Sequence, residues 1–298
     1  MKPLKKPLTF EEQVEKLISH GMVVDNNKDV LTVLKEKNYY RFTGYALQDR
    51  VSPHDSAYVS GTSFEHIYRL YLFDQSMRDV LRKFIEICEI YYRTQISYGF
   101  SIKKCLPEPH DQHYDESNFY NKNGYQQVIH NFHHDKKYYK DSLIMQHHEK
   151  EYDNRLPLWA MVEMLSFSNL SKLYSSMYQS EQDYIASLVG TGRNVLKNNL
   201  HCLSVLRNKC AHAARLYNTT FNPPVKFNDS FLRNHSDISN DTLFAYILVL
   251  LKRLPDKQYK SSFVLAIETV IEDFREDIDY KLIGLPENYE TLLEDLVS

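Results

Sequence analysis

The chain has 298 residues, with 36 lysines and arginines against 39 aspartates and glutamates, and a formal net charge of −3. This balance argues against a generic nucleic-acid-binding domain, which is usually basic, so any contact with nucleic acid should be local. The sequence holds only 8 glycines and 10 prolines and has no strong strand pattern, which favours helices. Its length is sufficient to bury a full core without disulfides or metals.

Neither a membrane span nor a secretory leader is expected. The longest apolar run, residues 243–251, is far shorter than the roughly 20 residues that a spanning helix needs. The first residues are basic but lack the apolar core of a signal peptide. The 4 cysteines show no metal-type spacing and are few for the size of the chain. We therefore expect a cytoplasmic protein with reduced cysteines and no membrane association.

The first hundred residues predict three helical stretches. A capping box at residues 9–12 opens a short helix, and a second helix is expected at about 28–37. An aromatic, turn-like segment follows at 38–45. A further capping box at 62–65 opens the longest periodic stretch, about 64–100, where apolar residues recur at the spacing of a helix that faces a core.

The rest of the chain predicts an irregular insertion and then more helices. Residues 103–155 hold seven of the 13 histidines and few aliphatic residues, which indicates short helices and loops. The helices expected after them are at 158–177, a short one capped by Ser180, and others at about 193–215, 241–254 and 261–277. The end of the chain, near 284–289, predicts a tether packed on the surface.

These elements predict an all-α protein. We divide it into an N-terminal helical extension, residues 1–60, and a helical domain, residues 61–298, that carries the insertion at about 103–155.

One long segment contains no acidic residue. From Tyr184 to Asn228 there is no aspartate or glutamate, whereas about six would be expected at the chain average. The segment carries six basic residues: Arg193, Lys197, Arg207, Lys209, Arg215 and Lys226. A locally positive surface is suited to RNA phosphates.

Within this segment, the residues able to act on an RNA phosphate are at 207–212. On a helix Asn208 and His212 share one face, as do His212 and Arg215, and the side chain of Arg207 is long enough to reach a phosphate beside the imidazole. The imidazole of His212 can move a proton near neutral pH, and Arg207 can stabilise charge on phosphoryl oxygens. Asn208 could fix the tautomer of His212 by a hydrogen bond. This set requires no metal or other cofactor.

Two interpretations of these residues remain open from their chemistry alone. The bare arginine-x4-histidine spacing arises often by chance. The structural interpretation is an arginine in a salt bridge and a histidine that caps a helix. The functional interpretation is a ribonuclease in which Arg207, Asn208 and His212 are catalytic.

The pattern Arg-Asn-x-Cys-Ala-His-x-x-Arg at 207–215 resembles the signature of the Abi-like (AbiD/AbiF) abortive-infection proteins, which belong to the HEPN superfamily. Four other segments are similar to that family, in the same order. They are the Asn-Tyr-Tyr-Arg segment at 38–41, the helix around 87–93, the Pro-Leu-Trp helix from 157 and the Gly-Leu-Pro-Glu-Asn tail at 284–288. Together they cover nearly the whole chain, with Ser168 standing where glycine would be expected.

The resemblance implies a HEPN-like helical bundle and a metal-independent endoribonuclease of antiphage abortive infection. Attack by a ribose 2′-hydroxyl would leave a 2′,3′-cyclic phosphate. By this resemblance the active residues are Arg207, Asn208 and His212. Because each chain has one motif, the resemblance also implies a homodimer in which two motifs share a cleft. The alternatives are a non-catalytic HEPN protein bound to a small structured RNA, and the toxin of a toxin–antitoxin pair.

Other residues are candidates for binding RNA. We expect contacts from basic and aromatic residues, namely Lys209, Arg215, Arg193, Lys197, Tyr39, Tyr40 and Arg41. A packed aromatic hinge is an equally good interpretation of Tyr39 and Tyr40. Glu89 and Arg93 predict a salt bridge within a helix, with a contact to the active cleft as the alternative. The pair His130 and His134 alone makes no metal site, so solvated loops are expected there.

Overall fold

The computed structural model describes residues 4–297 except 154, 229–230, 232–234 and 236. Within these residues the regular structure is helical, and strand pairing is limited to three isolated bridges, Val23–Ser63, Arg50–Tyr58 and Phe119–Met177. The prediction of an all-α fold is confirmed.

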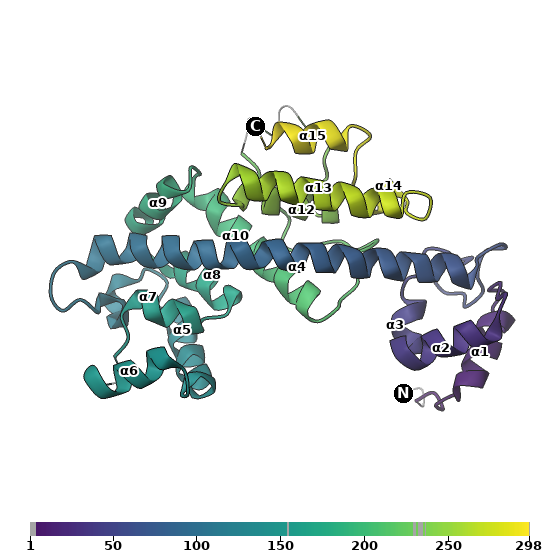
Figure 1. The fold of residues 1–298 in the computed structure, drawn as a ribbon, viewed down its shortest axis with the longest axis horizontal. Helices are drawn as coiled ribbons and strands as arrows, with labels where there is room; N and C mark the ends of the chain where they lie inside the picture. The colour runs from purple at the N-terminus through teal and green to yellow at the C-terminus, as the bar shows by residue number, and fades with distance from the viewer. Residues whose placement is uncertain (1–3, 154, 229–230, 232–234, 236, 298) are drawn as a thin grey trace.

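One long helix, α4 (Phe64–Phe100), forms the axis of the molecule (Figure 1). Its apolar residues recur through ten turns and pack against α7, α9, α10, α12 and α13. The helix has the predicted bounds, but its N-cap is Ser63, one residue after the Thr62 that opens the predicted capping box. Ser63 is the last residue with extended dihedrals, and its hydroxyl accepts a hydrogen bond from the His66 amide.

Three N-terminal helices lie at one end of α4: α1 (Phe10–Ser19), α2 (Asn27–Lys37) and α3 (Tyr39–Thr43). The capping box of Thr9 and Glu12 is confirmed. The turn-like segment at 38–45 is in fact a short helix, because the Asn38 side chain accepts from the Tyr40 amide and so starts a helical turn.

Short elements at the other end of α4 form the predicted insertion. They are η1 (Ser101–Cys105), η2 (Gln112–Tyr114), η3 (Glu116–Asn118), α5 (Lys122–Asp135), η4 (Lys136–Tyr139) and α6 (Leu143–Glu151). The insertion is anchored by α5, which packs on α8 and buries Val128 and Phe132.

The helix predicted at 158–177 is broken. The structure has α7 (Leu158–Met161), η5 (Val162–Met164) and α8 (Phe167–Ser176) in its place. Leu165 is extended, and the Ser166 hydroxyl accepts from the Asn169 amide to start a new helix. The next helix, α9 (Gln179–Leu188), already begins at Gln179, so Ser180 is not its cap.

Helix α10 (Arg193–Ala211) ends four residues before the predicted position. After it come α12 (Leu243–Arg253), α13 (Lys257–Asp273), α14 (Tyr280–Ile283) and α15 (Tyr289–Asp295). Every residue from Leu243 to Leu251 is buried, as expected for a helix that is apolar all round. The predicted tether is a non-helical link over residues 284–288 that buries Leu285, and α15, which follows it, contributes Leu292 and Leu293 to the core.

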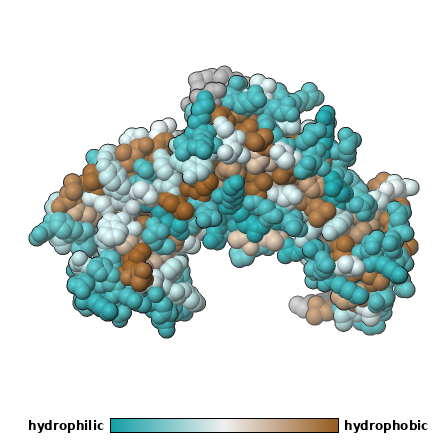
Figure 2. All heavy atoms as spheres, viewed as in Figure 1, coloured by the Kyte–Doolittle hydropathy of each residue, from teal (hydrophilic) through white to brown (hydrophobic). Residues whose placement is uncertain are grey.

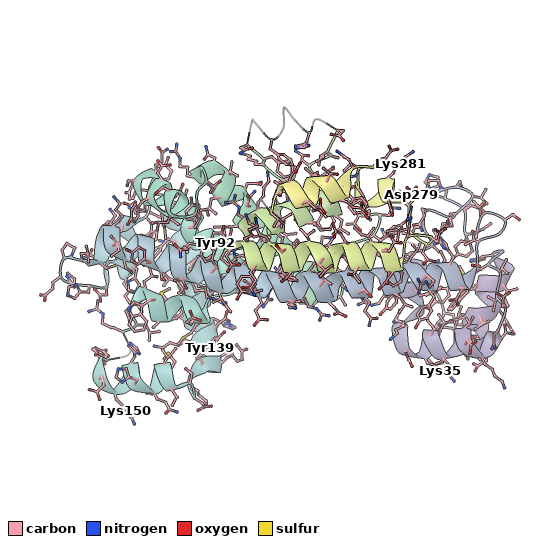
Figure 3. The ribbon with its side chains drawn as sticks, turned by 45° about the horizontal axis from the view of Figure 1, so that its top comes forward. Lys35, Tyr92, Tyr139, Lys150, Asp279 and Lys281 are labelled. Carbon is pink, nitrogen blue, oxygen red and sulfur yellow. The ribbon has the colours of Figure 1, made fainter. Side chains whose placement is uncertain are left out.

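The helices form an arch (Figure 2). The group α1–α3 and the group α5–α6 project from the same side, with a broad hollow between them. Helix α10 crosses α4, and its C-terminal end with the following loop lies over this hollow (Figure 1). The buried residues form one core from Val14 to Leu293, and Tyr92 of α4, labelled in Figure 3, belongs to it. The division at residue 60 stays a prediction.

Candidate functional site

The candidate motif lies at the C-terminal end of α10. Arg207 and Asn208 are in its last turns, His212 occupies the C-cap position, and all three are exposed. Leu203, Leu206 and Cys210 bury the opposite face of the helix. The motif side chains therefore point away from the core because the apolar face anchors α10 behind them.

The chain turns sharply just after His212. The amide of His212 still donates to the Asn208 carbonyl at 3.0 Å, but Ala213 has φ +49°, a left-handed conformation that ends the helix. Arg215 thus lies beyond the helix, and the prediction that it shares a helical face with His212 is wrong.

A buried carboxylate fixes this turn. Asp74 of α4 is fully buried and accepts from the amides of Leu216 at 2.6 Å and Tyr217 at 2.8 Å. It also accepts from the Tyr45 hydroxyl at 2.8 Å, whose pKa is raised by burial so that it stays a donor. The Arg78 guanidinium lies 3.4 Å from the same carboxylate and donates to the Ala214 carbonyl at 3.2 Å. Contacts to α4 therefore place the segment after His212.

A second acid of α4 reaches the motif itself. Glu89 is 8% exposed, and its Oε2 lies 3.8 Å from Nε of Arg207. Its Oε1 accepts from Nη2 of Arg93 at 2.6 Å, which confirms the predicted intrahelical salt bridge. Arg93 also donates to two main-chain carbonyls, of Val162 and Leu165, at 3.0 Å each. Glu89 thus lies between a fixed arginine and the exposed one.

Asn208 has a different partner from the expected one. Its amide donates to the Ser168 hydroxyl of α8 at 3.2 Å, in place of a bond to the imidazole of His212. The side chain therefore ties α10 to α8 beside the motif.

A polar groove of about 410 Å³ runs from Asn208 along α10. Three serines of α8 line one side, Ser168, Ser171 and Ser175, and their small side chains leave the groove open. The lining is basic because it includes Lys172 of α8 and Lys197 and His201 of α10. No carboxylate contributes to it. Lys197 is one of the predicted RNA contacts, whereas Lys172 and His201 were not predicted. The spacing of four between Lys197 and His201 is the signal that could have indicated His201.

A second basic cavity, of about 720 Å³, lies on the other side of the motif. Its lining includes Tyr40, Arg41, Arg50 and Arg215. Arg41 donates to the Ala213 carbonyl, next to His212, and Arg215 donates to the Gly44 carbonyl. This reciprocal pair of contacts joins α3 to the loop after α10.

The two tyrosines of α3 differ. Tyr40 is 87% exposed and faces the second cavity, whereas Tyr39 is partly buried beneath Lys16, whose Nζ lies 5.7 Å from the ring centre. Burial raises the pKa of the Tyr39 hydroxyl. The hinge interpretation fits Tyr39, and only Tyr40 is available to a ligand.

Two predicted RNA contacts are engaged with other residues of the chain. Arg193 stands at the opposite end of α10, roughly 28 Å away for a helix of this length, and pairs with both carboxylate oxygens of Asp183 at 2.7 and 2.9 Å. Lys209 is partly buried over the ring of Phe221 at 5.0 Å, and burial lowers the pKa of its amine.

The histidines of the insertion are not gathered as metal ligands. In the part of the chain that the structure describes, no three histidine, cysteine or carboxylate side chains form a group able to hold a metal ion. The same residues include no helix with the length and apolar character of a membrane span.

The family model of Abi-like proteins matches residues 32–218, which is more than half of the chain. This chain belongs to the Abi-like protein family. No curated protein and no solved structure matches it. The match includes α4, the serine face of α8, the motif and the two amides that Asp74 binds. In this Abi-like protein the helices α12–α15 lie outside the matched region.

Proposed function

We propose that this Abi-like protein is a metal-independent endoribonuclease of the HEPN type that acts in antiphage abortive infection. The observation that carries the proposal is the position of Arg207 and His212. Both are exposed at the end of α10, between the groove of Lys172, Lys197 and His201 and the cavity of Tyr40, Arg41 and Arg215. A single RNA strand lying along these surfaces would pass the imidazole.

The chemistry follows from the two side chains. His212 would take the proton of a ribose 2′-hydroxyl, whose oxygen attacks the adjacent phosphorus and expels the 5′-oxygen. Arg207 would stabilise the negative charge that grows on the phosphoryl oxygens. The products are a 2′,3′-cyclic phosphate and a 5′-hydroxyl. The leaving oxygen needs a proton from a second group.

A homodimer supplies that group. One chain offers one exposed His212, and a twofold axis near the end of α10 would place a second copy of this histidine across the same phosphate. Arg207 and His212 are exposed at this end of α10, so a second copy can reach them. We therefore expect two motifs in one composite cleft.

The test compares wild-type protein with His212→Ala and Arg207→Ala on end-labelled RNA in EDTA. We expect wild-type cleavage that leaves cyclic-phosphate ends, with a loss of about a hundredfold or more in each variant. His133→Ala, which removes an exposed histidine of α5, is the control and should cleave normally. Light scattering at micromolar concentration should give the mass of a dimer.

The second candidate is a non-catalytic RNA-binding protein. It is favoured by the structural roles of the motif residues, namely the ion pair of Arg207 with Glu89, the Asn208–Ser168 bond and the C-cap position of His212. Copurification of one discrete RNA with both wild type and His212→Ala, without cleavage, would establish this alternative. Full cleavage by His212→Ala would refute the assignment of the active site.

A further inference from the structure

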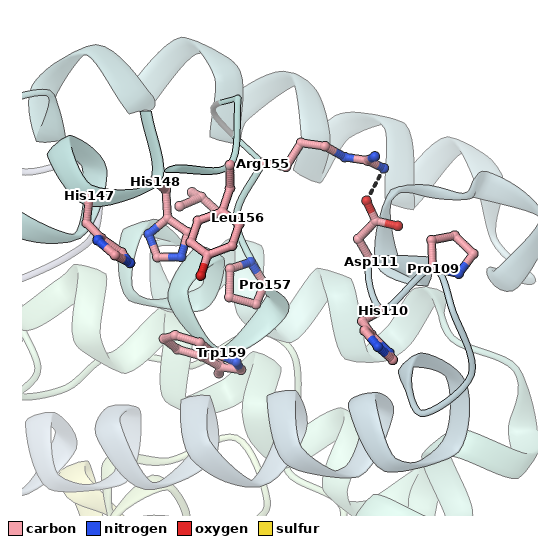
Figure 4. A pocket seen from close by; sticks show the side chains of 10 residues that line it. Pro109, His110, Asp111, His147, His148, Arg155, Leu156, Pro157 and Trp159 are labelled. Carbon is pink, nitrogen blue, oxygen red and sulfur yellow. Dashed lines mark ion pairs between the residues drawn. The ribbon is translucent and has the colours of Figure 1, made fainter. Parts of the chain in front are cut away.

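A separate cavity of about 460 Å³ lies in the insertion, between the loop at 109–111, helix α6 and the start of α7 (Figure 4). Its volume is in the range of small-molecule sites. Its lining residues do not include any residue of the candidate ribonuclease site. Whatever binds here is therefore recognised independently of Arg207 and His212.

Aromatic rings form much of the cavity wall. Trp159 is the only tryptophan of the chain and is 60% exposed, and Tyr152 is 56% exposed. His148 is close to both, with its ring centre 6.1 Å from that of Trp159 and 5.3 Å from that of Tyr152. Figure 4 shows His148 and Trp159 at the cavity. Exposed rings in a concave site favour a flat aromatic ligand, because such a ligand can stack on them.

His148 adds a directional polar group. The residue is only 5% exposed, and its Nδ1 lies 2.8 Å from the Ile144 carbonyl, which can only accept, so Nδ1 carries a proton. With the proton on Nδ1, Nε2 presents a lone pair, and it has no hydrogen-bond partner among the residues that the structure describes. Nε2 is not a fully buried atom, so it can accept a hydrogen bond from a molecule in the cavity. A ligand N–H donor would supply it.

The rim of the cavity carries an exposed arginine. The Arg155 guanidinium is 62% exposed and contacts the Asp111 carboxylate (Figure 4), and His110 and His147 also line the cavity. A guanidinium has five donors, so one that holds a carboxylate can still bind a second anion. The rim is therefore suited to a phosphate attached to the stacked ring.

We propose that this cavity binds a nucleobase that carries a phosphate. The base stacks on Trp159 and Tyr152 and donates an N–H to Nε2 of His148, and the phosphate lies at Arg155. Two sources share this chemistry, a free mononucleotide and an unpaired nucleotide of an RNA strand. The proposal goes beyond the ribonuclease activity and does not depend on it.

The single tryptophan provides the first measurement. Adenosine, guanosine, cytidine and uridine 5′-monophosphates are titrated into the full-length protein while the fluorescence of Trp159 is followed. We expect saturable quenching by at least one of them. Ribose 5-phosphate, which lacks the base, should give none, and the matching nucleoside, which lacks the phosphate, should bind at least about fivefold more weakly.

Calorimetry of variants then tests the residues. Trp159→Ala should weaken binding by about tenfold or more, and Trp159→Phe, which keeps a ring, should restore most of it. Arg155→Ala should weaken the nucleotide but leave the nucleoside unchanged. Arg275→Ala removes an equally exposed arginine that also pairs with an acid and should have no effect. These positions are exposed, so the fold should survive each change.

The source of the ligand is decided by competition with a short single-stranded RNA in the His212→Ala background. Displacement of the nucleotide by the RNA at lower concentration assigns the cavity to a strand, and failure of the RNA to compete assigns it to a free nucleotide. The proposal is overturned if neither the four nucleotides nor the RNA gives a saturable change up to about 10 mM, well above millimolar affinity. Equal binding by Trp159→Ala would overturn it as well.

Discussion

The carboxylate of Glu89 lies 3.8 Å from the guanidinium of Arg207, although the two residues are far apart in the sequence. The acid-free segment around the motif thus obtains a countercharge from a different helix. Glu89 is itself held by Arg93, which two main-chain carbonyls fix in place. The direction of Arg207 is therefore set by α4 and by the segment between α7 and α8.

We predict that Glu89→Gln impairs catalysis more than binding. The amide keeps the shape of the side chain but removes the charge that orients Arg207, so kcat should fall at least about tenfold while KM for RNA changes little. Loss of a charged hydrogen bond to Arg93 should also cost about 1–3 kcal/mol of unfolding free energy. Single-turnover cleavage and urea unfolding measure the two effects. A normal kcat in a destabilised Glu89→Gln protein would show that Glu89 has a purely structural role.

Asp74→Ala should destabilise the protein strongly. The change leaves two amides, the Tyr45 hydroxyl and the charge of Arg78 buried without their acceptor, which should cost about 3–5 kcal/mol. Asp79→Ala on the same helix is the matched control. Asp79 is an exposed carboxylate that pairs with Arg82, and its loss should change the unfolding free energy by less than about 1 kcal/mol. Equal unfolding midpoints for the two variants would refute the importance of this buried acid.

The basic groove between α8 and α10 predicts that the salt dependence of RNA affinity will change when its lysines are replaced. In the His212→Ala background, replacement of Lys172 and Lys197 by glutamine should lower RNA affinity and reduce the slope of log K against log salt by about 1.4, or about 0.7 for each lost phosphate contact. The control replaces Lys35 and Lys281 by glutamine, because both lysines are exposed and remote from this groove (Figure 3). Fluorescence anisotropy at several salt concentrations measures the slope. An unchanged slope would mean that RNA follows another path.

The buried imidazole of His113 should make the stability of the fold depend on pH. It is 1% exposed, and burial lowers the pKa of its imidazole to about 4. Because the unfolded chain binds this proton near pH 6.5 and the folded chain does not, the histidine destabilises the fold as the pH falls from about 6.5 toward 4. The total loss should be on the order of 3 kcal/mol.

His113→Gln should make that dependence shallower, since glutamine can still donate to the Leu156 carbonyl that Nε2 contacts at 2.9 Å. Urea unfolding of both proteins between pH 4.5 and 7.5 gives the difference. Parallel curves over this range would contradict the assignment, because every other titrating group is shared by the two proteins.

Local signals were enough to predict the helices and their class. The capping box of Thr9, the periodicity of 64–100 and the apolar run of 243–251 each reflect interactions within a few turns of chain, and the structure has a helix at each. The family resemblance through 207–215 was likewise available in the sequence, and the match over 32–218 confirms the family. Where prediction failed, as at Leu165 and Ala213, the chain leaves the helix through a cap or a left-handed residue that propensity does not reveal.

Local patterns alone predict that the protein is helical and that Asn208 and His212, four residues apart, lie on one helical face with Arg207 in the same turns. The partners of these residues follow from tertiary packing. Packing of distant helices brings three residues to the motif and its loop, namely Glu89, Asp74 and Ser168. In the same way, α6 folds back beside α7, and this brings Tyr152, His148 and Trp159 together around one cavity. Such contacts join residues far apart in the chain, and no local pattern encodes them.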